Sequence, residues 1–324
     1  MLFLGRRDVE QLLDTVQLVD AVALGMSDLS AGRASVPPRV GARVPEWTGV
    51  LGAMPGYSPA LGVLAAKLVT VFPQNTDRPT HQALIAVFDP ATGAPVAVMD
   101  GEVITSARTA ACSALSIRLL ARADAHVLAV LGTGVQARAH ALAATAVHPF
   151  DEVRIAGRNP AKVEALAADL SAHGLCVRAA ASWPEALREA DVVCATTNSP
   201  EPVVRREWLG PGVHVTSVGS NSVGREVDDA TVADALVVVE ERDTALAPYP
   251  AGTADVAEPL SRGLIDIADI VEIGELVDGR RPGRASPGQL TLYKSVGVAV
   301  QDVAAAALVL AAAREHGLGR TLEL

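Results

Sequence analysis

The sequence predicts an α/β protein built from two parts, and three observations lead to this prediction. First, 324 residues exceed what one hydrophobic core usually organises, so two domains are expected. Second, short apolar strands alternate with helices from about residue 125 onward, which is typical of a parallel sheet covered on both faces. Third, the first third of the chain holds apolar strands separated by turns, which indicates an antiparallel or mixed sheet with a helix.

The first third begins with a predicted helix over residues 8–32, because apolar residues recur there at helical spacing. A region rich in proline and glycine follows. Strands are predicted at 61–72 and 81–89, and the turn "DPATG" then leads to a returning strand at 95–99.

The pattern changes near residue 105, where a helix is predicted to residue 122. Later strands are predicted at 125–131, 153–156, 175–178, 191–195, 213–218 and 236–239, with helices at 160–173 and 184–189. The last helix, from about residue 296, falls outside this alternation, and we expect it to rejoin the first part. The expected domains are therefore 1–121 with 297–324, and 122–296.

Composition narrows the function classes. A net charge of -10 argues against a nucleic-acid partner, since phosphate binding needs a basic face. The three cysteines form no CxxC pair, which suits a reducing cytoplasm and favours neither a disulfide framework nor a metal site. The start "MLFLGRRDVEQLL" has too short an apolar run for a signal peptide, and the apolar tail at 304–313 is too short to cross a bilayer. We therefore expect a cytoplasmic protein without a membrane partner.

A glycine-rich turn follows the strand at 125–131 and opens a helix. Its residues are Gly132, Thr133, Gly134, Val135, Gln136 and Ala137. This is a GxGxxA turn after a strand, the phosphate-binding turn of a Rossmann unit. The first glycine makes the turn, the second admits the pyrophosphate, and the small third residue lets helix and strand pack closely. The helix N-terminus then offers N–H groups to the phosphates.

The end of the next strand indicates which nucleotide binds. An acidic residue there would hold the ribose hydroxyl of NAD, whereas arginine favours the phosphate of NADP. The sequence reads "VRIAGRNP", with Arg158 able to clamp a phosphate and Asn159 able to cap the helix begun by Pro160. We therefore expect NADP(H) rather than NAD(H). Thr196 and Thr197, at the end of the fourth strand, are expected to neighbour the cofactor or to cap that strand.

Three cationic side chains precede the Rossmann turn in unusual settings. Lys67 interrupts the apolar strand "LAAKLVTVF", either as an edge-strand lysine that prevents aggregation or as a lysine at the wall of a dry pocket. Arg39 follows two prolines. Arg108 is expected in the first turn of the helix at 105–122, where the helix dipole disfavours a cation and an anion nearby would offset the penalty.

Several motifs together resemble the ornithine cyclodeaminase/mu-crystallin family over nearly the full chain. They are "PPRV", "AAKLVTVFPQN", "PTHQALIAVFDPATGAPVAVMDGEVITSARTAACSALS", "LGTGVQARAH", "SVGSNSVGREVD" and "YKSVGVAVQD". The resemblance implies a substrate-binding and dimerisation domain from both chain ends, with a Rossmann domain between them. It also implies a homodimer and hydride transfer at the carbon next to a carboxylate.

The resemblance also implies roles for individual residues. Arg39 and Arg108 would grip the substrate carboxylate, and Lys67 would handle a proton at the reacting atom. A lysine among apolar residues and two arginines should have a lowered pKa. Lys294 and Ser295 would lie near the nicotinamide. Apart from the resemblance, Trp47, Met54, Tyr57 and His81 are candidate pocket walls, although core packing explains the apolar ones equally well and His81 could instead satisfy a backbone group.

One position departs from the cyclodeaminases, which carry an aspartate after this Val-Gly pair. Asn221 stands there instead, and asparagine cannot act as a base. The resemblance therefore favours an NAD(P)H-dependent reductase of an imine next to a carboxylate, such as pyrroline-2-carboxylate or piperideine-2-carboxylate, giving an L-amino acid. Ornithine cyclodeaminase, an alanine-type dehydrogenase and a non-catalytic NADPH-binding protein stay open as alternatives.

Overall fold

The computed structural model describes residues 1–219 and 224–323. The chain packs into two compact units, Met1–Arg108 with Gly297–Leu324, and Thr109–Val296. The division falls inside one helix, α3 (Gly101–Leu120). The expected domain boundary after residue 121 lies at the C-terminal end of this helix, and the assignment of substrate and cofactor domains stays a prediction.

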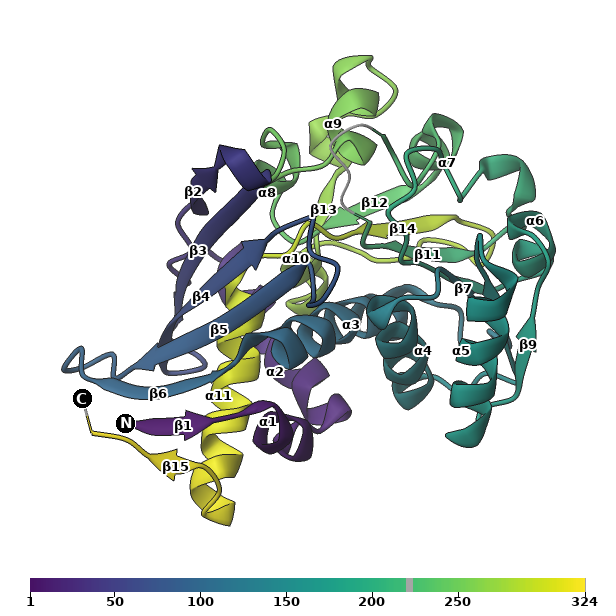
Figure 1. The fold of residues 1–324 in the computed structure, drawn as a ribbon. Coiled ribbons are helices and arrows are strands. Elements are labelled where there is room, and N and C mark those ends of the chain that lie inside the picture. Colours follow the sequence, from purple (N-terminus) through teal and green to yellow (C-terminus); the bar gives the residue numbers. More distant parts are fainter. Residues whose placement is uncertain (220–223, 324) are drawn as a thin grey trace. The chain divides into compact units, whose positions relative to one another are not determined.

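The first unit contains a seven-stranded sheet that includes strands from both chain ends (Figure 1). Its order is β15 (Arg320–Thr321), β1 (Leu2–Leu4), β6 (Pro95–Asp100), β5 (His81–Phe88), β4 (Val63–Val71), β3 (Gly49–Ser58) and β2 (Val40–Val44). The strands β2 to β6 pair antiparallel, as the turn-rich sequence predicts, and β1 runs parallel to β6.

This unit holds the helices α1 (Arg6–Leu12), α2 (Thr15–Ser30) and α11 (Ala299–His316), together with the first part of α3. The prediction of one helix over 8–32 is wrong at its start, because Asp14 accepts a hydrogen bond from the backbone N–H of Gln17 and begins a second helix. Helix α11 packs against α2, β3 and β4. Small residues allow this close packing, since a Cβ at Gly56 would lie 3.1 Å from Val303 and 3.2 Å from Ala299.

The second unit contains an eight-stranded sheet whose neighbouring strands all run parallel. Its order is β13 (Val271–Glu272), β12 (Leu236–Val239), β14 (Thr291–Lys294), β11 (His214–Ser217), β10 (Val192–Ala195), β7 (Val127–Leu131), β8 (Glu152–Ala156) and β9 (Val177–Ala179). The predicted α/β class with a Rossmann sheet is confirmed. The sequence reading missed β13 and the fully buried β14.

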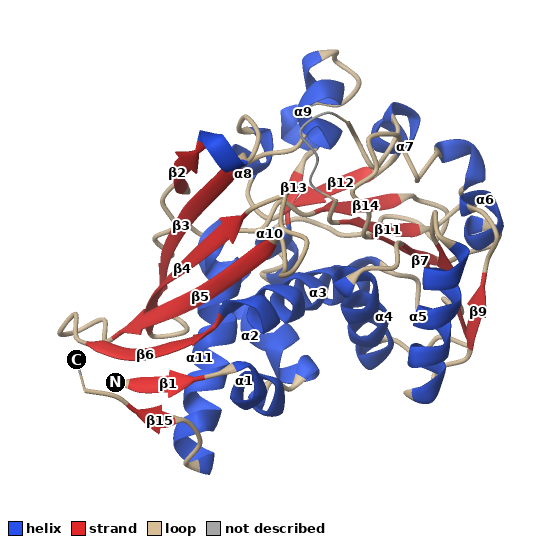
Figure 2. Ribbon diagram, viewed as in Figure 1, coloured by secondary structure: helices blue, strands red, loops and turns tan. Residues whose placement is uncertain are grey.

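Helices connect these parallel strands, as Figure 2 shows. They are α4 (Val135–Val147), α5 (Pro160–Ala172), α6 (Trp183–Leu187), α7 (Asp229–Asp234), α8 (Arg242–Leu246), α9 (Ala254–Ser261) and α10 (Ile273–Val277). Helices α4 and α5 contact each other, and their apolar faces share one core cluster with β7 and β8. Within the described ranges, no helix has both the length and the apolar character that a bilayer crossing needs.

Candidate functional site

Lys67 lies in the middle of the first unit's sheet. Its strand, β4, pairs with β3 on one side and β5 on the other, which places Lys67 opposite Met54 and Ile85. The side chain is only 2% exposed. The edge-strand interpretation of this lysine is therefore wrong, and a buried ammonium needs compensating partners.

The main partner is Asp302 on α11, which the sequence reading did not single out. Its Oδ2 lies 2.8 Å from the Lys67 Nζ, and its Oδ1 accepts a hydrogen bond of 3.1 Å from the Arg108 Nε. The Arg108 Nη1 also donates to the side-chain oxygen of Gln301. All four side chains are buried. One carboxylate thus bridges two buried cations.

The electrostatics of this cluster follow from its burial. Burial lowers the pKa of Lys67 to about 8, and the positive charges of Arg108 and Arg39 add to that effect while Asp302 opposes it. Burial alone would raise the pKa of Asp302, but Arg108 and Lys67 hold it below its usual value. Asp302 is therefore ionised near neutral pH, and Lys67 can exchange a proton there. The expected lowering of the Lys67 pKa is confirmed.

Arg39 and Arg108 both lie against Gly297, just before α11. The Arg39 Nη2 donates a 2.7 Å hydrogen bond to the carbonyl of Gly297. Gly297 has a φ of +74°, and a Cβ there would lie 2.8 Å from the Arg108 Nη1, so only glycine fits at this position. The structure thus gathers both arginines and Lys67 around the start of α11.

The expected position of Arg108 in a first helical turn is wrong. Helix α3 begins at Gly101, where Asp100 accepts a hydrogen bond from the backbone N–H of Val103. Arg108 lies in the second turn, so the helix dipole does not explain its setting. The anion that the sequence reading invoked is present as Asp302.

His81 lies away from this cluster. It begins β5 opposite Val71, is exposed, and its ring contacts the hydroxyl of Thr80. It lies four positions before Ile85, the residue of β5 that is paired with Lys67, which is roughly 13 Å along the strand. Among the other suggested pocket walls, Met54 adjoins Lys67 in the sheet, whereas Trp47 is 61% exposed. A role for His81 in substrate binding stays a prediction.

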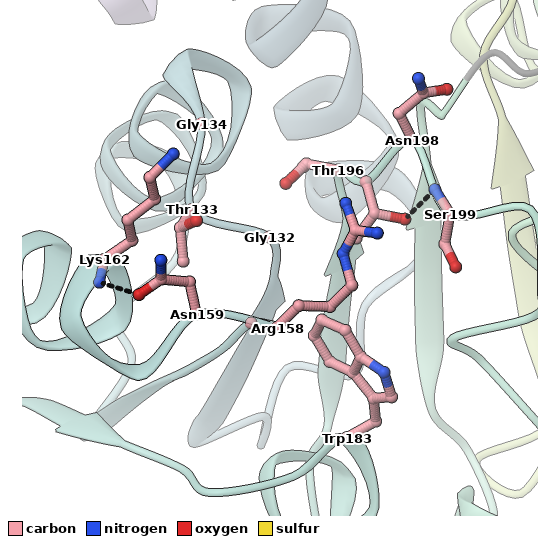
Figure 3. A pocket seen from close by; sticks show the side chains of 12 residues that line it. Gly132, Thr133, Gly134, Arg158, Asn159, Lys162, Trp183, Thr196, Asn198 and Ser199 are labelled. Carbon is pink, nitrogen blue, oxygen red and sulfur yellow. Dashed lines mark hydrogen bonds between the residues drawn. The ribbon is translucent and has the colours of Figure 1, made fainter.

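The second unit has a cavity of about 500 Å³ at the carboxyl edge of its sheet. Its lining comprises Gly132, Thr133, Gly134, Gly157, Arg158, Asn159, Lys162, Trp183, Thr196, Thr197, Asn198 and Ser199 (Figure 3). Most of the predicted cofactor residues therefore line one cavity. Of the others on the Rossmann turn, Val135 is 69% exposed at the start of α4, and Ala137 is buried in the core.

The glycine-rich turn has the shape that a phosphate needs. Gly132 has a φ of +126°, and a Cβ there would lie 2.6 Å from the Thr196 hydroxyl, so this position requires glycine. A Cβ at Gly134 would meet no atom within 4 Å, which leaves open space before α4. The first N–H groups of that helix have no intrahelical acceptor, and an anion in this space would satisfy them. The turn fits a dinucleotide.

Two cations, Arg158 and Lys162, line this cavity. Asn159 caps α5 by accepting from the backbone N–H of Lys162, as predicted. In Figure 3 the guanidinium of Arg158 points toward Thr196, and the ammonium of Lys162 points toward the turn at Gly134. The sequence reading named Arg158 and missed Lys162. A lysine in the first turn of a helix that follows the second strand is the signal that it overlooked.

The threonines at the end of β10 are tied to protein partners. Thr196 donates its hydroxyl hydrogen to the carbonyl of Leu131. The carboxylate of Glu226 accepts from both the N–H and the hydroxyl of Thr197, and from Ser217 and the N–H of Gly219. Glu226 therefore fastens the ends of β10 and β11 together, a role that the sequence reading missed.

Lys294, like the two threonines, is bound to other residues of the protein. Its buried ammonium contacts the Ser217 hydroxyl at 2.9 Å, the carbonyl of Gly219 at 2.7 Å and Asp255 at 2.9 Å. These three partners match its three N–H donors. The neighbouring Ser295 donates to Glu240. Lys294 thus ties the end of β14 to the end of β11, and Ser295 ties it to the residue after β12. The predicted site residue Asn221 lies outside the described residues.

Comparisons with known proteins agree with this geometry. Residues 1–317 match the model of the ornithine cyclodeaminase/mu-crystallin family. Ketimine reductase mu-crystallin of Mus musculus is 37% identical over 95% of this chain and 96% of its own length. The solved structure of Thermococcus litoralis Delta(1)-pyrroline-2-carboxylate reductase with NADH and L-proline is 34% identical, with a TM-score of 0.93 over 99% of this chain and 100% of that chain. An archaeal alanine dehydrogenase dimer with bound NAD is 30% identical, with a TM-score of 0.92 over 100% and 99%.

Proposed function

Because the chain belongs to the ornithine cyclodeaminase/mu-crystallin family, we propose that it is an NADPH-dependent reductase of an imine next to a carboxylate. A five- or six-membered cyclic ketimine, pyrroline-2-carboxylate or piperideine-2-carboxylate, is the proposed substrate, and an L-amino acid is the product. The two relatives that act on such imines support this choice, since they match nearly all of this chain.

The observation that carries the proposal is the buried cluster of Lys67, Arg108 and Asp302 beside Arg39. Arg39 and Arg108 supply guanidinium groups that can hold a carboxylate in a fixed orientation. Lys67, whose pKa is about 8, can protonate the ring nitrogen of an imine near neutral pH. A protonated imine accepts hydride more readily than a neutral one, so protonation by Lys67 would speed the reduction.

We assign the nicotinamide nucleotide to the cavity of the second unit, where the glycine turn fits its phosphates. When bound, it supplies the hydride. The proposed preference for NADP(H) over NAD(H) is supported by Arg158 and Lys162 and by the lack of a carboxylate at the tip "AGRNP". The archaeal relative with bound NAD has the same fold, so the preference depends on these side chains rather than on the fold.

A homodimer in the cytoplasm completes the proposal. One face of the first unit's sheet is apolar and partly exposed, and the strand register sets Ala53, Leu68 and Leu84 side by side on it. Leu51 and Leu84 on this face are 43% and 42% exposed. Such a face is typical of a protein interface. Cys112, Cys176 and Cys194 are free thiols, which suits a reducing compartment.

The test follows the absorbance of NADPH with each cyclic ketimine, with pyruvate plus ammonia or methylamine, and with ornithine plus oxidised nucleotide. We expect rapid oxidation of NADPH with a cyclic ketimine. Lys67→Ala should abolish it while leaving NADPH binding nearly unchanged. Tight NADPH binding without turnover would contradict the proposal in favour of a binding protein, and release of ammonia and proline from ornithine would favour a cyclodeaminase.

A further inference from the structure

The carboxylate of Asp302 contacts both Lys67 and Arg108, which points to a role beyond neutralising their charges. We propose that Asp302 is a positioning residue, which keeps Lys67 protonated and directs its ammonium without itself contacting the substrate. This proposal rests on the proposed function, because it assigns to Lys67 the proton that the imine nitrogen receives.

Asp302 holds two cationic side chains at once. The two oxygens of Asp302 address different cations, Oδ2 the Lys67 Nζ at 2.8 Å and Oδ1 the Arg108 Nε at 3.1 Å. Lys67 comes from β4 and Arg108 from α3, whereas Asp302 comes from α11, near the other end of the chain. Asp302 therefore fixes the proton donor and a carboxylate-binding arginine relative to each other. It also takes up one of the three N–H directions of Lys67.

The charges of the cluster show why the anion is needed. The charged groups that face Lys67 are Arg108 from α3, Asp302 from α11 and Arg39 from the segment before β2. Its strand neighbours, Met54 and Ile85, are apolar. Without Asp302, three cations would share a buried site, and the lysine is the only one that can lose its proton readily. The ion pair therefore keeps the proton donor charged.

In the proposed proton transfer, Lys67 supplies the proton and the charge of Asp302 does not change. The Nζ–H bond of Lys67 breaks as the N–H bond of the substrate forms, and Lys67 is left neutral. Solvent then reprotonates it, and Asp302 stays ionised throughout. Asp302→Asn keeps the shape of the side chain and removes its charge, so this variant isolates the electrostatic role.

The composition makes a direct measurement practical, because the chain has only three lysines, Lys67, Lys162 and Lys294. Protein labelled at the lysine side chains gives three NMR signals, and Lys67→Arg identifies the one from Lys67. We expect Asp302→Asn to lower the titration midpoint of Lys67 by about 1–3 pH units. An unchanged midpoint would overturn the proposal. Asp302→Ser is a second variant with the same expected fall, should the asparagine fail to fold.

Activity provides a second readout. The pH profile of kcat/KM is measured with a cyclic ketimine and NADPH. In Asp302→Asn the fall of kcat/KM at high pH, its alkaline limb, should move to lower pH, whereas Asp302→Glu should restore the wild-type limb. The matched control is Asp28→Asn on α2, a buried carboxylate of the same unit that accepts from Ser58, Ala60 and Arg33. It should lower stability without moving the limb. A loss of activity in Asp302→Asn with an unmoved limb would show a structural role only.

The two readouts separate this inference from the proposed function. If wild-type protein reduces no imine yet the Lys67 midpoint falls in Asp302→Asn, the substrate assignment fails and the coupling of the two residues stands. If imines are reduced and the midpoint does not move, the function stands and the role given to Asp302 fails.

Discussion

The ammonium of Lys67 lies 2.8 Å from the carboxylate of Asp302, although one residue comes from an early strand and the other from the last helix. The other oxygen of this carboxylate accepts a hydrogen bond from Arg108. These contacts make Lys67, the charge that interrupts an apolar strand, a candidate proton donor.

The pH dependence of wild-type turnover follows from Lys67. Its pKa is lowered to about 8, so its protonated form, the proton donor, is lost as the pH rises above that value. We expect kcat/KM for imine reduction to fall about tenfold per pH unit above pH 8. Initial rates from pH 6 to 10 measure this, and a flat profile up to pH 10 would exclude Lys67 as the donor.

Arg39→Lys should weaken substrate binding. Lysine keeps the positive charge and loses the planar fork that holds a carboxylate. Loss of one charged hydrogen bond costs about 1.5–3 kcal/mol, so KM for the imine should rise roughly tenfold to hundredfold. Steady-state kinetics measures the change. Arg43→Lys, at an exposed arginine of β2, is the control and should leave KM unchanged; equal values for both variants would remove Arg39 from the site.

Arg158→Ala and Lys162→Ala should each weaken NADPH binding and spare NADH. In the proposed binding mode, each side chain offers a cation to the phosphate that distinguishes the two nucleotides, and one such contact corresponds to roughly tenfold in affinity. Titration of both nucleotides against each variant measures this. Arg178→Ala, whose guanidinium pairs with Glu152 and Glu185, should change neither affinity. A wild-type preference for NADH would refute the cofactor assignment.

Glu226→Gln should destabilise the second unit by roughly 2–4 kcal/mol, because its carboxylate accepts four hydrogen bonds and the amide group of glutamine would face two donors. Urea unfolding measures the loss. Glu258→Gln, at a side chain that is 58% exposed and pairs with Arg225, should cost less than about 0.5 kcal/mol. Similar losses in both variants would argue against Glu226 as the fastener of the strand ends.

Local sequence signals predicted much of the fold. The GxGxxA turn fixed the place of the Rossmann sheet, and Asn159 before Pro160 fixed the start of α5. Local signals that were overlooked explain the errors at helix starts, since Asp14 and Asp100 both cap helices through their carboxylates. The buried β14 was missed because its sequence, TLYK, is not an apolar run, in contrast to LVVV in the equally short β12.

The candidate site was predictable only in part. Lys67 was conspicuous because a charge interrupts an apolar strand. Asp302 was not, because α11 is buried over most of its circumference and its alanines give no apolar stripe that would show which way a side chain points. Its pairing with Lys67 depends on the packing of α11 against β4, which is a tertiary contact. The three partners of Lys294 are likewise distant from it in the sequence, and tertiary packing brings them together.

The most direct test of the central claim is the fate of a labelled hydride. Pyrroline-2-carboxylate is incubated with NADPH that carries deuterium at the transferable position of the nicotinamide, and the product is analysed by proton NMR and chiral chromatography. The proposed reaction predicts L-proline with deuterium at C2 for wild-type protein and no product for Lys67→Ala. Absence of deuterium at C2, or equal product from both proteins, would contradict it.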